Sequence, residues 1–179
     1  MVFGGGVRKP QKVIFFNAIL IDSTFIGKID EYLIDIFGLP ILKSEVFSFN
    51  HTDYYKDEMG ENLVKYFACY DIIDYPDKLP LFKRVAVEIE EFFMEKGKRK
   101  VNIDPGYIAL EKVVAASTKN FSHRIYLGDS IYADLQLYRK GKKYNPLPWT
   151  FYDYKTDNAL TFFERARAIL ERHLHEQKI

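Results

Sequence analysis

The side chains best suited to chemistry gather near residue 120. His123 can carry a proton near neutral pH, which makes it a candidate catalytic residue. Lys119 and Arg124 lie close to it and could hold a phosphate or carboxylate group. A structural role is equally open. If residues 123–127 form a strand, His123 shares a face with Ile125 and Leu127 and packs at the edge of the core, while Arg124 points the other way.

A second candidate is Asp104, at the start of the run Asp104-Pro105-Gly106-Tyr107. Pro105 pre-sets a turn and Gly106 tolerates positive φ, so the run is expected to end a short strand. A carboxylate at a strand end could act as a catalytic base or a metal ligand. It could equally be a turn former with no further role.

The acidic and aromatic segment 50–60 contributes two candidate ligand-binding residues, Asp53 and Tyr54. His51 with Asp53 could bind a divalent metal, but no HExxH or CxxC spacing supports a zinc site. A loop in which Asp53 caps a helical turn is the structural alternative. We therefore predict no metal site.

Known signatures of nucleotide and covalent chemistry are missing from the sequence. It contains no GxxxxGK[ST] phosphate loop, no GxGxxG after a strand and no GxSxG elbow. The cofactor, if there is one, is left unidentified.

The composition is that of an ordinary globular protein. The 179 residues are 47% hydrophobic, and the formal net charge of +1 gives no overall attraction to nucleic acid, which is not an expected partner. No segment reaches the roughly 18 apolar residues of a membrane span, and the N-terminus lacks an apolar signal core. Cys69, the only cysteine, lies in an apolar run. We expect a cytoplasmic protein without a membrane partner.

Hydrophobic periodicity predicts the elements that position these residues. Strands are expected at 12–21, 44–49, 63–70 and 101–103, and helices at 25–37 and 79–95. The order strand, helix, strand, strand, helix, strand is the ferredoxin-like split βαβ pattern. The prediction is one α+β domain over residues 1–179, with residues 1–11 as a loose leader.

The rest of the chain is expected to extend this core with a strand at 112–117, a β-hairpin and a C-terminal helix from 157 or 158 to about 176. A three-residue loop, 128–130, pairs like with like across the hairpin. It sets Leu127 opposite Ile131 and Arg124 opposite Asp134, which gives Arg124 an ion-pair partner.

Four segments carry a resemblance to a known family: FSFNHTDYYKDEMG at 47–60, VNIDPGY at 101–107, TKNFSHRIYLGDSIYAD at 118–134 and LPWTFYDY at 147–154. Together they resemble the DUF4416 family, and the order of the predicted elements agrees over nearly the whole chain. The resemblance implies a prokaryotic family without a defined biochemical role, so it supplies no activity and no catalytic residues.

Three functional hypotheses follow. The first is a small enzyme or binding protein for a phosphorylated or otherwise anionic small molecule. The second is a homo-oligomeric scaffold or interaction protein, suggested by the 16% aromatic content. The third is an RNA-binding module, because the run Lys65–Tyr70 resembles the base-stacking strand of such modules but lacks their glycine.

Overall fold

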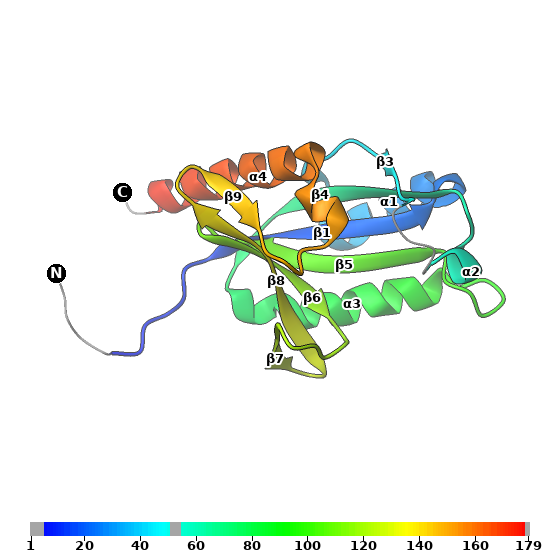
Figure 1. The fold of residues 1–179 in the computed structure, drawn as a ribbon, viewed down its shortest axis with the longest axis horizontal. Coiled ribbons are helices and arrows are strands. Elements are labelled where there is room, and N and C mark those ends of the chain that lie inside the picture. Colours follow the sequence, from blue (N-terminus) through cyan, green and yellow to red (C-terminus); the bar gives the residue numbers. More distant parts are fainter. Residues whose placement is uncertain (1–5, 51–54, 178–179) are drawn as a thin grey trace.

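The structure, a computed structural model, describes residues 6–50 and 55–177. It is a mixed α/β fold with a nine-stranded antiparallel sheet and four α-helices in this part of the chain (Figure 1). The strands are β1 (Val13–Asp22), β2 (Pro40–Lys43), β3 (Phe47–Ser48), β4 (Leu63–Asp74), β5 (Val101–Ile108), β6 (Lys112–Ser117), β7 (Arg124–Gly128), β8 (Ile131–Lys140) and β9 (Lys143–Pro146). The helices are α1 (Ile26–Phe37), α2 (Lys56–Met59), α3 (Leu79–Phe92) and α4 (Asp157–Glu176).

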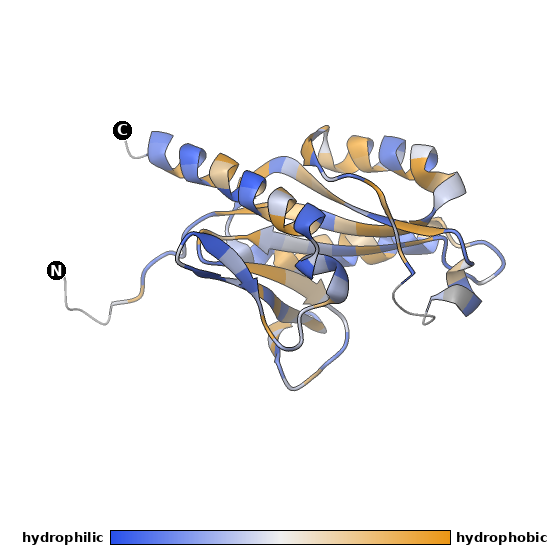
Figure 2. Cartoon of the chain, turned by 45° about the horizontal axis from the view of Figure 1, so that its top comes forward, coloured by the Kyte–Doolittle hydropathy of each residue, from blue (hydrophilic) through white to orange (hydrophobic). Residues whose placement is uncertain are grey.

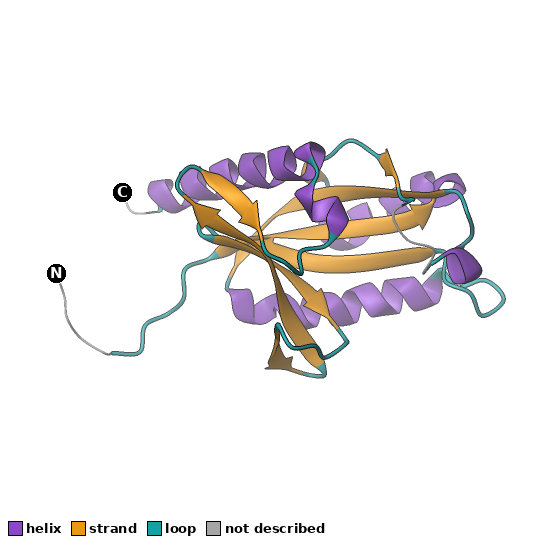
Figure 3. Ribbon diagram, in the orientation of Figure 1, coloured by secondary structure: helices purple, strands orange, loops and turns teal. Residues whose placement is uncertain are grey.

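The sheet follows the strand order β2-β4-β1-β5-β6-β8-β7, with β3 added to β4 and β9 added to β8. Helices α1 and α3 pack on one face of the first four strands, and α4 packs on the other (Figure 3). Strand β1 therefore lies between two layers of helix. This explains its nearly continuous apolar sequence, because both of its faces are buried.

The core consists of large side chains from both sheet faces. Phe16 and Phe67 pack against Phe162 and Phe163 of α4, with ring centroids 5.2–6.3 Å apart. On the opposite face, Ile19 lies in a separate cluster with α1 and α3. Hydrophobic residues line the strands, whereas hydrophilic residues recur along α4, as expected for a helix with one buried face (Figure 2).

The predicted strand at 44–49 is largely wrong. The strand after α1 is β2, which begins at Pro40, and only Phe47 and Ser48 of the predicted segment pair with β4. Pro40 begins a strand at the edge of the sheet, a position where its missing N–H breaks no ladder.

The predicted turn at residues 104–107 is also wrong, because β5 continues through it to Ile108. Gly106 is not at positive φ. It serves close packing instead: a Cβ there would lie 2.5 Å from the Val114 carbonyl oxygen and would overlap the Phe16 ring. Asp104 consequently sits within a strand rather than at its end.

The hairpin of β7 and β8 confirms most of the predicted register. Arg124 lies opposite Asp134, and the next two pairs also agree with the prediction. Leu127 does not face Ile131, because a bulge brings Gly128 to that position. The loop is thus the two residues Asp129 and Ser130, both at positive φ as in a type I′ turn.

The C-terminal helix α4 confirms the predicted limits. Thr156 caps it by accepting a hydrogen bond from the Ala159 N–H. None of the described helices combines the length and apolar character needed to cross a membrane.

A charged cleft where two strands separate

Strands β5 and β6 pair only over residues 106–108 and 113–115, and they diverge beyond this point (Figures 1 and 3). Within the described chain, residues 101–105 therefore pair with β1 alone. The backbone of Ile103 on the open edge is satisfied by helix α3. Lys83 Nζ donates to the Ile103 carbonyl at 2.7 Å, and Glu90 Oε1 accepts from the Ile103 N–H at 2.8 Å.

Two side chains thus occupy the place of a partner strand. In a strand, the backbone N–H and C=O groups of successive residues point to alternate sides. Residue 105 therefore directs its backbone to the same open side as residue 103, and because it is a proline it has no N–H there that needs a partner. A sheet edge inside a fold needs such partners, because unpaired backbone groups are costly to bury.

Asp104 is held at the floor of the opening. Asp104 lies opposite Ala18 of β1, so its side chain is on the same face of the sheet as α4. Lys83 comes from α3 on the other face and reaches Asp104 around the edge of β5. Asp104 Oδ1 accepts from Lys83 at 3.0 Å and Oδ2 accepts from Asn102 at 3.0 Å. The Asp104 side chain remains 27% exposed, whereas Lys83 is only 4% exposed.

The charges of this group are set by their neighbours. Burial alone would raise the pKa of Asp104, but Lys83 and Lys65 outweigh it and hold that pKa below its ordinary value. Burial would lower the pKa of Lys83, yet Asp104 and Glu90 raise it overall. Asp104 and Lys83 are therefore an ionised pair at neutral pH. Burial raises the pKa of Glu90 against the opposing charges of Lys83 and Arg99.

Arg99 forms the next layer of the network. It binds both carboxylate oxygens of Glu58 at 2.7 and 2.8 Å, and this contact lowers the pKa of Glu58. Its Nη1 also reaches Asn102 Oδ1 at 2.9 Å and Glu90 Oε2 at 3.4 Å. Most donors of Arg99 are thereby used inside the protein.

The opposite wall comes from the loop after β6 and the start of β7. Arg124 Nε donates to Asp134 Oδ2 at 2.7 Å, which confirms the predicted ion pair, and Nη1 donates to the Lys119 carbonyl at 2.9 Å. Asp134 is buried and also lies 3.5 Å from His123 Nε2. The His123 ring stacks on Trp149 with centroids 5.0 Å apart.

These walls enclose a cleft of about 270 Å³. Most of its lining residues are charged or polar, and two are aromatic, Tyr55 and Phe151. Its lining residues are Tyr55, Lys83, Val87, Glu90, Arg99, Asn102, Asp104, Ala116, Ser117, Thr118, Lys119, Arg124 and Phe151.

Three of the candidate residues named from sequence, Asp104, Lys119 and Arg124, line this one cleft. His123 is not among the lining residues; it contacts Asp134 behind Arg124. The predicted alternation, with His123 and Arg124 on opposite faces of a strand, is wrong, because β7 begins at Arg124 and both side chains contact Asp134. Asp53 and Tyr54 lie outside the described residues.

Sequence reasoning missed Lys83, Glu90 and Arg99. A signal was present: Lys83 and Glu90 are seven residues apart, in the same stripe of α3 as the buried Leu79 and Ala86. Charges in an apolar stripe need buried partners, which is the clue to a polar cluster.

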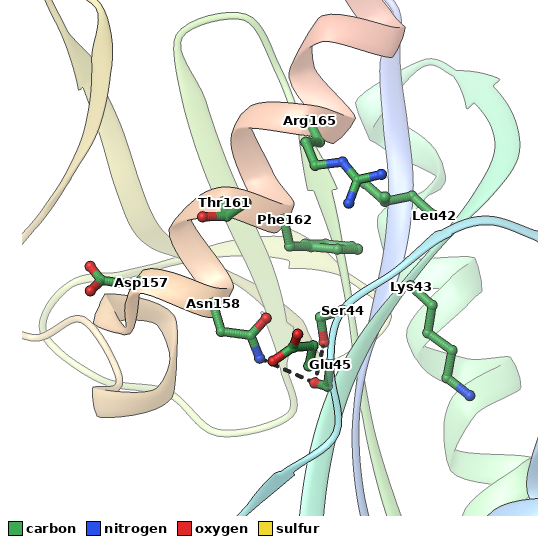
Figure 4. A pocket seen from close by; sticks show the side chains of 9 residues that line it. All are labelled: Leu42, Lys43, Ser44, Glu45, Asp157, Asn158, Thr161, Phe162 and Arg165. Atoms are coloured by element: carbon green, nitrogen blue, oxygen red, sulfur yellow. Dashed lines mark hydrogen bonds between the residues drawn. The ribbon is translucent and has the colours of Figure 1, made fainter.

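A second pocket, of about 350 Å³, lies between β2 and α4 (Figure 4). Its polar groups do not converge. Lys43 extends away from the helix and pairs with Asp30 at 2.5 Å, and Asn158 donates to the Glu45 carbonyl at 3.1 Å. We take the smaller β5/β6 cleft as the candidate site for this reason. In the described part of the chain, no group of three or more His, Cys, Asp or Glu side chains is placed to hold a metal ion.

The aromatic run that resembled an RNA-binding strand is part of β4. Tyr66 and Phe67 are fully buried. Lys65 is also buried, on the face of the sheet that carries α4, and forms a 2.6 Å ion pair with Asp153. Rings in these positions have no exposed face for a base to stack on.

Fold and cleft together define a mixed α/β protein whose antiparallel sheet opens around a network of charges. The chain belongs to the DUF4416 family, described as a domain of unknown function, whose model matches residues 11–170. This confirms the family indicated by the four sequence segments. No curated protein and no solved structure matches the chain.

Proposed function

We propose that the protein is a cytoplasmic enzyme or binding protein that receives a small anionic molecule in the β5/β6 cleft. The observation that carries the proposal is the state of Arg124. Its guanidinium has five N–H donors, and Nε and Nη1 each use one in the contacts with Asp134 and Lys119. Nη2 makes no hydrogen bond within the described residues, so it is available to a phosphate or carboxylate.

Several features support an anion in this position. Lys119, an exposed cation, lines the cleft beside Arg124. Asp134 holds the Arg124 guanidinium in place, which lowers the entropy lost when a ligand binds. The planar fork of arginine also suits the two acceptor oxygens of such a group.

The two candidate catalytic residues take different roles in this proposal. Asp104 touches the ligand. It does so as an ionised hydrogen-bond acceptor, because nearby lysines hold its pKa below the ordinary value. His123 acts through Asp134 and is a positioning residue for Arg124. No catalytic step is assigned to either.

We also infer that β1, α1, β2, β4, α3 and β5 form a ferredoxin-like core, and that β6–β9 and α4 extend it within one domain. The inference is supported by the order β2-β4-β1-β5, in which α1 and α3 each connect two parallel strands across a third. The cleft would then lie where the extension leaves the core.

Calorimetric titration with propyl phosphate tests the anion site. Arg124→Gln is expected to weaken binding about tenfold or more, because a hydrogen bond to a charged group contributes roughly 1.5–3 kcal/mol. Arg84→Gln is the matched control, since Arg84 is an exposed arginine of α3 that does not line the cleft. Equal affinities for the two variants would refute the proposal, and so would a failure of the unaltered protein to bind any organic phosphate.

Self-association is a second candidate, favoured by strand β7. This strand is at the edge of the sheet, and its residues Ile125 and Tyr126 are 70% and 59% exposed. It carries neither lysine nor proline, two common protections of an edge strand, and its one irregularity is the bulge before Gly128. Light scattering should then find a dimer that Ile125→Lys disrupts and Leu81→Lys, a change at an exposed leucine of α3, does not. A monomer at all concentrations would count against this candidate.

A further inference from the structure

The acceptor groups of the cleft lie beside its cations and indicate more about the ligand than its charge. Asp104 is the clearest case. Each carboxylate oxygen can accept about two hydrogen bonds, and each accepts one, from Lys83 or from Asn102. The remaining acceptor positions belong to a side chain that is 27% exposed and lines the cleft.

A ligand group that meets Asp104 must therefore donate a hydrogen bond. An ammonium group is poorly suited, because Lys83 already places a positive charge 3.0 Å from the carboxylate. A hydroxyl group donates without adding charge, so it can occupy the open positions without repulsion from Lys83. The chemistry of the floor thus selects a neutral donor.

The cleft also limits the size of the ligand. Its volume is about 270 Å³. This suits a molecule of the size of a short polyol or one sugar ring rather than a polymer. Tyr55 and Phe151 also line the cleft, and aromatic side chains are suitable neighbours for the C–H groups of such a molecule.

We propose that the ligand is a hydroxylated organic phosphate, of the polyol-phosphate or sugar-phosphate class, whose hydroxyl donates to Asp104 while its phosphate binds Arg124. This inference rests on the proposed anion site. It adds that recognition requires a hydroxyl as well as the phosphate.

Two probes separate the hydroxyl from the phosphate. Glycerol 3-phosphate and propyl phosphate carry the same phosphate on a three-carbon chain, and only the first has hydroxyl groups. Calorimetry on the unaltered protein should give an affinity for glycerol 3-phosphate about tenfold or more above that for propyl phosphate, because a donor to a charged acceptor is gained. Ribose 5-phosphate should share this preference over propyl phosphate.

Two variants assign the effect to the two ends of the ligand. Asp104→Asn should remove the preference for glycerol 3-phosphate, and Arg124→Gln should weaken both probes. The comparison in the unaltered protein needs no variant, so it remains decisive if Asp104→Asn fails to fold.

The outcomes distinguish this inference from the proposed function. Equal binding of both probes, weakened by Arg124→Gln and indifferent to Asp104→Asn, would overturn the hydroxyl requirement and leave the anion site standing. No binding of any probe would overturn both. Binding of inorganic phosphate as tight as that of glycerol 3-phosphate would also overturn the hydroxyl requirement, because the organic part would then contribute nothing.

Discussion

Strand β5 has two halves that obey different rules. Residues 106–108 lie between β1 and β6, and Gly106 is packed so closely that no side chain fits there. Residues 101–105 pair with β1 alone in the described structure, and their open edge is satisfied by Lys83 and Glu90. Residues 106–108 are stabilised by apolar packing, and residues 101–105 by ionic contacts.

The difference teaches where a sheet can carry chemistry. A ladder on both sides leaves no backbone group and no space for a ligand. Where one ladder is replaced by side chains, charges enter the sheet and a carboxylate such as Asp104 gains an exposed face. The two halves meet between Pro105 and Gly106, and their different energetics can be tested directly.

The largest effect is expected from Lys83→Met, in the ionic half. It removes the donor to the Ile103 carbonyl and leaves Asp104 without its nearest cation. Breaking a buried pair in this way destabilises a protein by about 3–5 kcal/mol. Urea denaturation measures the free energy of unfolding. Lys112→Met, on a lysine at the start of β6 that is 42% exposed, is the control and should change it by less than about 0.5 kcal/mol. Similar losses in both variants would contradict the ionic account.

A smaller effect is expected from Gly106→Ala, in the packed half. The new methyl group would meet the Val114 carbonyl and the Phe16 ring, so overpacking should cost about 1–3 kcal/mol. Gly27→Ala is the matched control in α1, where a Cβ meets nothing within 4 Å. It should stabilise the protein by about 0.5–1 kcal/mol, because alanine favours a helix. The pair fails as an explanation if the two variants change stability in the same direction.

The most limited effect is confined to acid pH. Because the folded-state pKa of Asp104 is lowered, its ionisation stabilises the fold above its unfolded pKa near 3.8, and this contribution is lost as pH falls through the lower folded value. The stability difference between the unaltered protein and Asp104→Asn should therefore shrink below about pH 4. The measurement is urea denaturation at pH 7, 4 and 3.

Two further groups enter this comparison. Glu90, with its raised pKa, binds its proton first as pH falls and acts in the opposite direction. Because Asp104 itself contributes to that raised pKa, both proteins are compared in a Glu90→Gln background, so that the difference isolates Asp104. Asp129→Asn, at an exposed turn position, is the control whose difference should not depend on pH in this way. A difference for Asp104→Asn that stays constant down to pH 3 would show that Asp104 is not held ionised by Lys83.

The sequence predicts most of the sheet and helix framework because its periodic signals are strong. Strand β1, helix α3 and helix α4 all have long apolar patterns, and the pairing of Arg124 with Asp134 follows from matching residues across a hairpin. Strand β2 is not predicted, because its four residues, which begin at Pro40, show no alternation of apolar and polar side chains.

The candidate site is less predictable because its contacts are long-range. The sequence marks Asp104 as a candidate catalytic residue or a turn former at a strand end, whereas its actual surroundings come from α3 and β5 together. Nothing local to Asp-Pro-Gly indicates that β6 leaves the strand at this point. The pairing of Arg99 with Glu58 spans a distance of 41 residues in sequence and likewise has no local signature.

The stacking of Trp149 on His123 gives the protein an internal optical reporter. Trp149 is the only tryptophan, so all indole emission comes from a ring that lies 5.0 Å from the imidazole and donates to the Leu135 carbonyl. The imidazole contacts the carboxylate that holds Arg124. A change in the engagement of Arg124 therefore reaches the fluorophore through three contacts, and the emission of the unlabelled protein can follow binding in the cleft without any added dye.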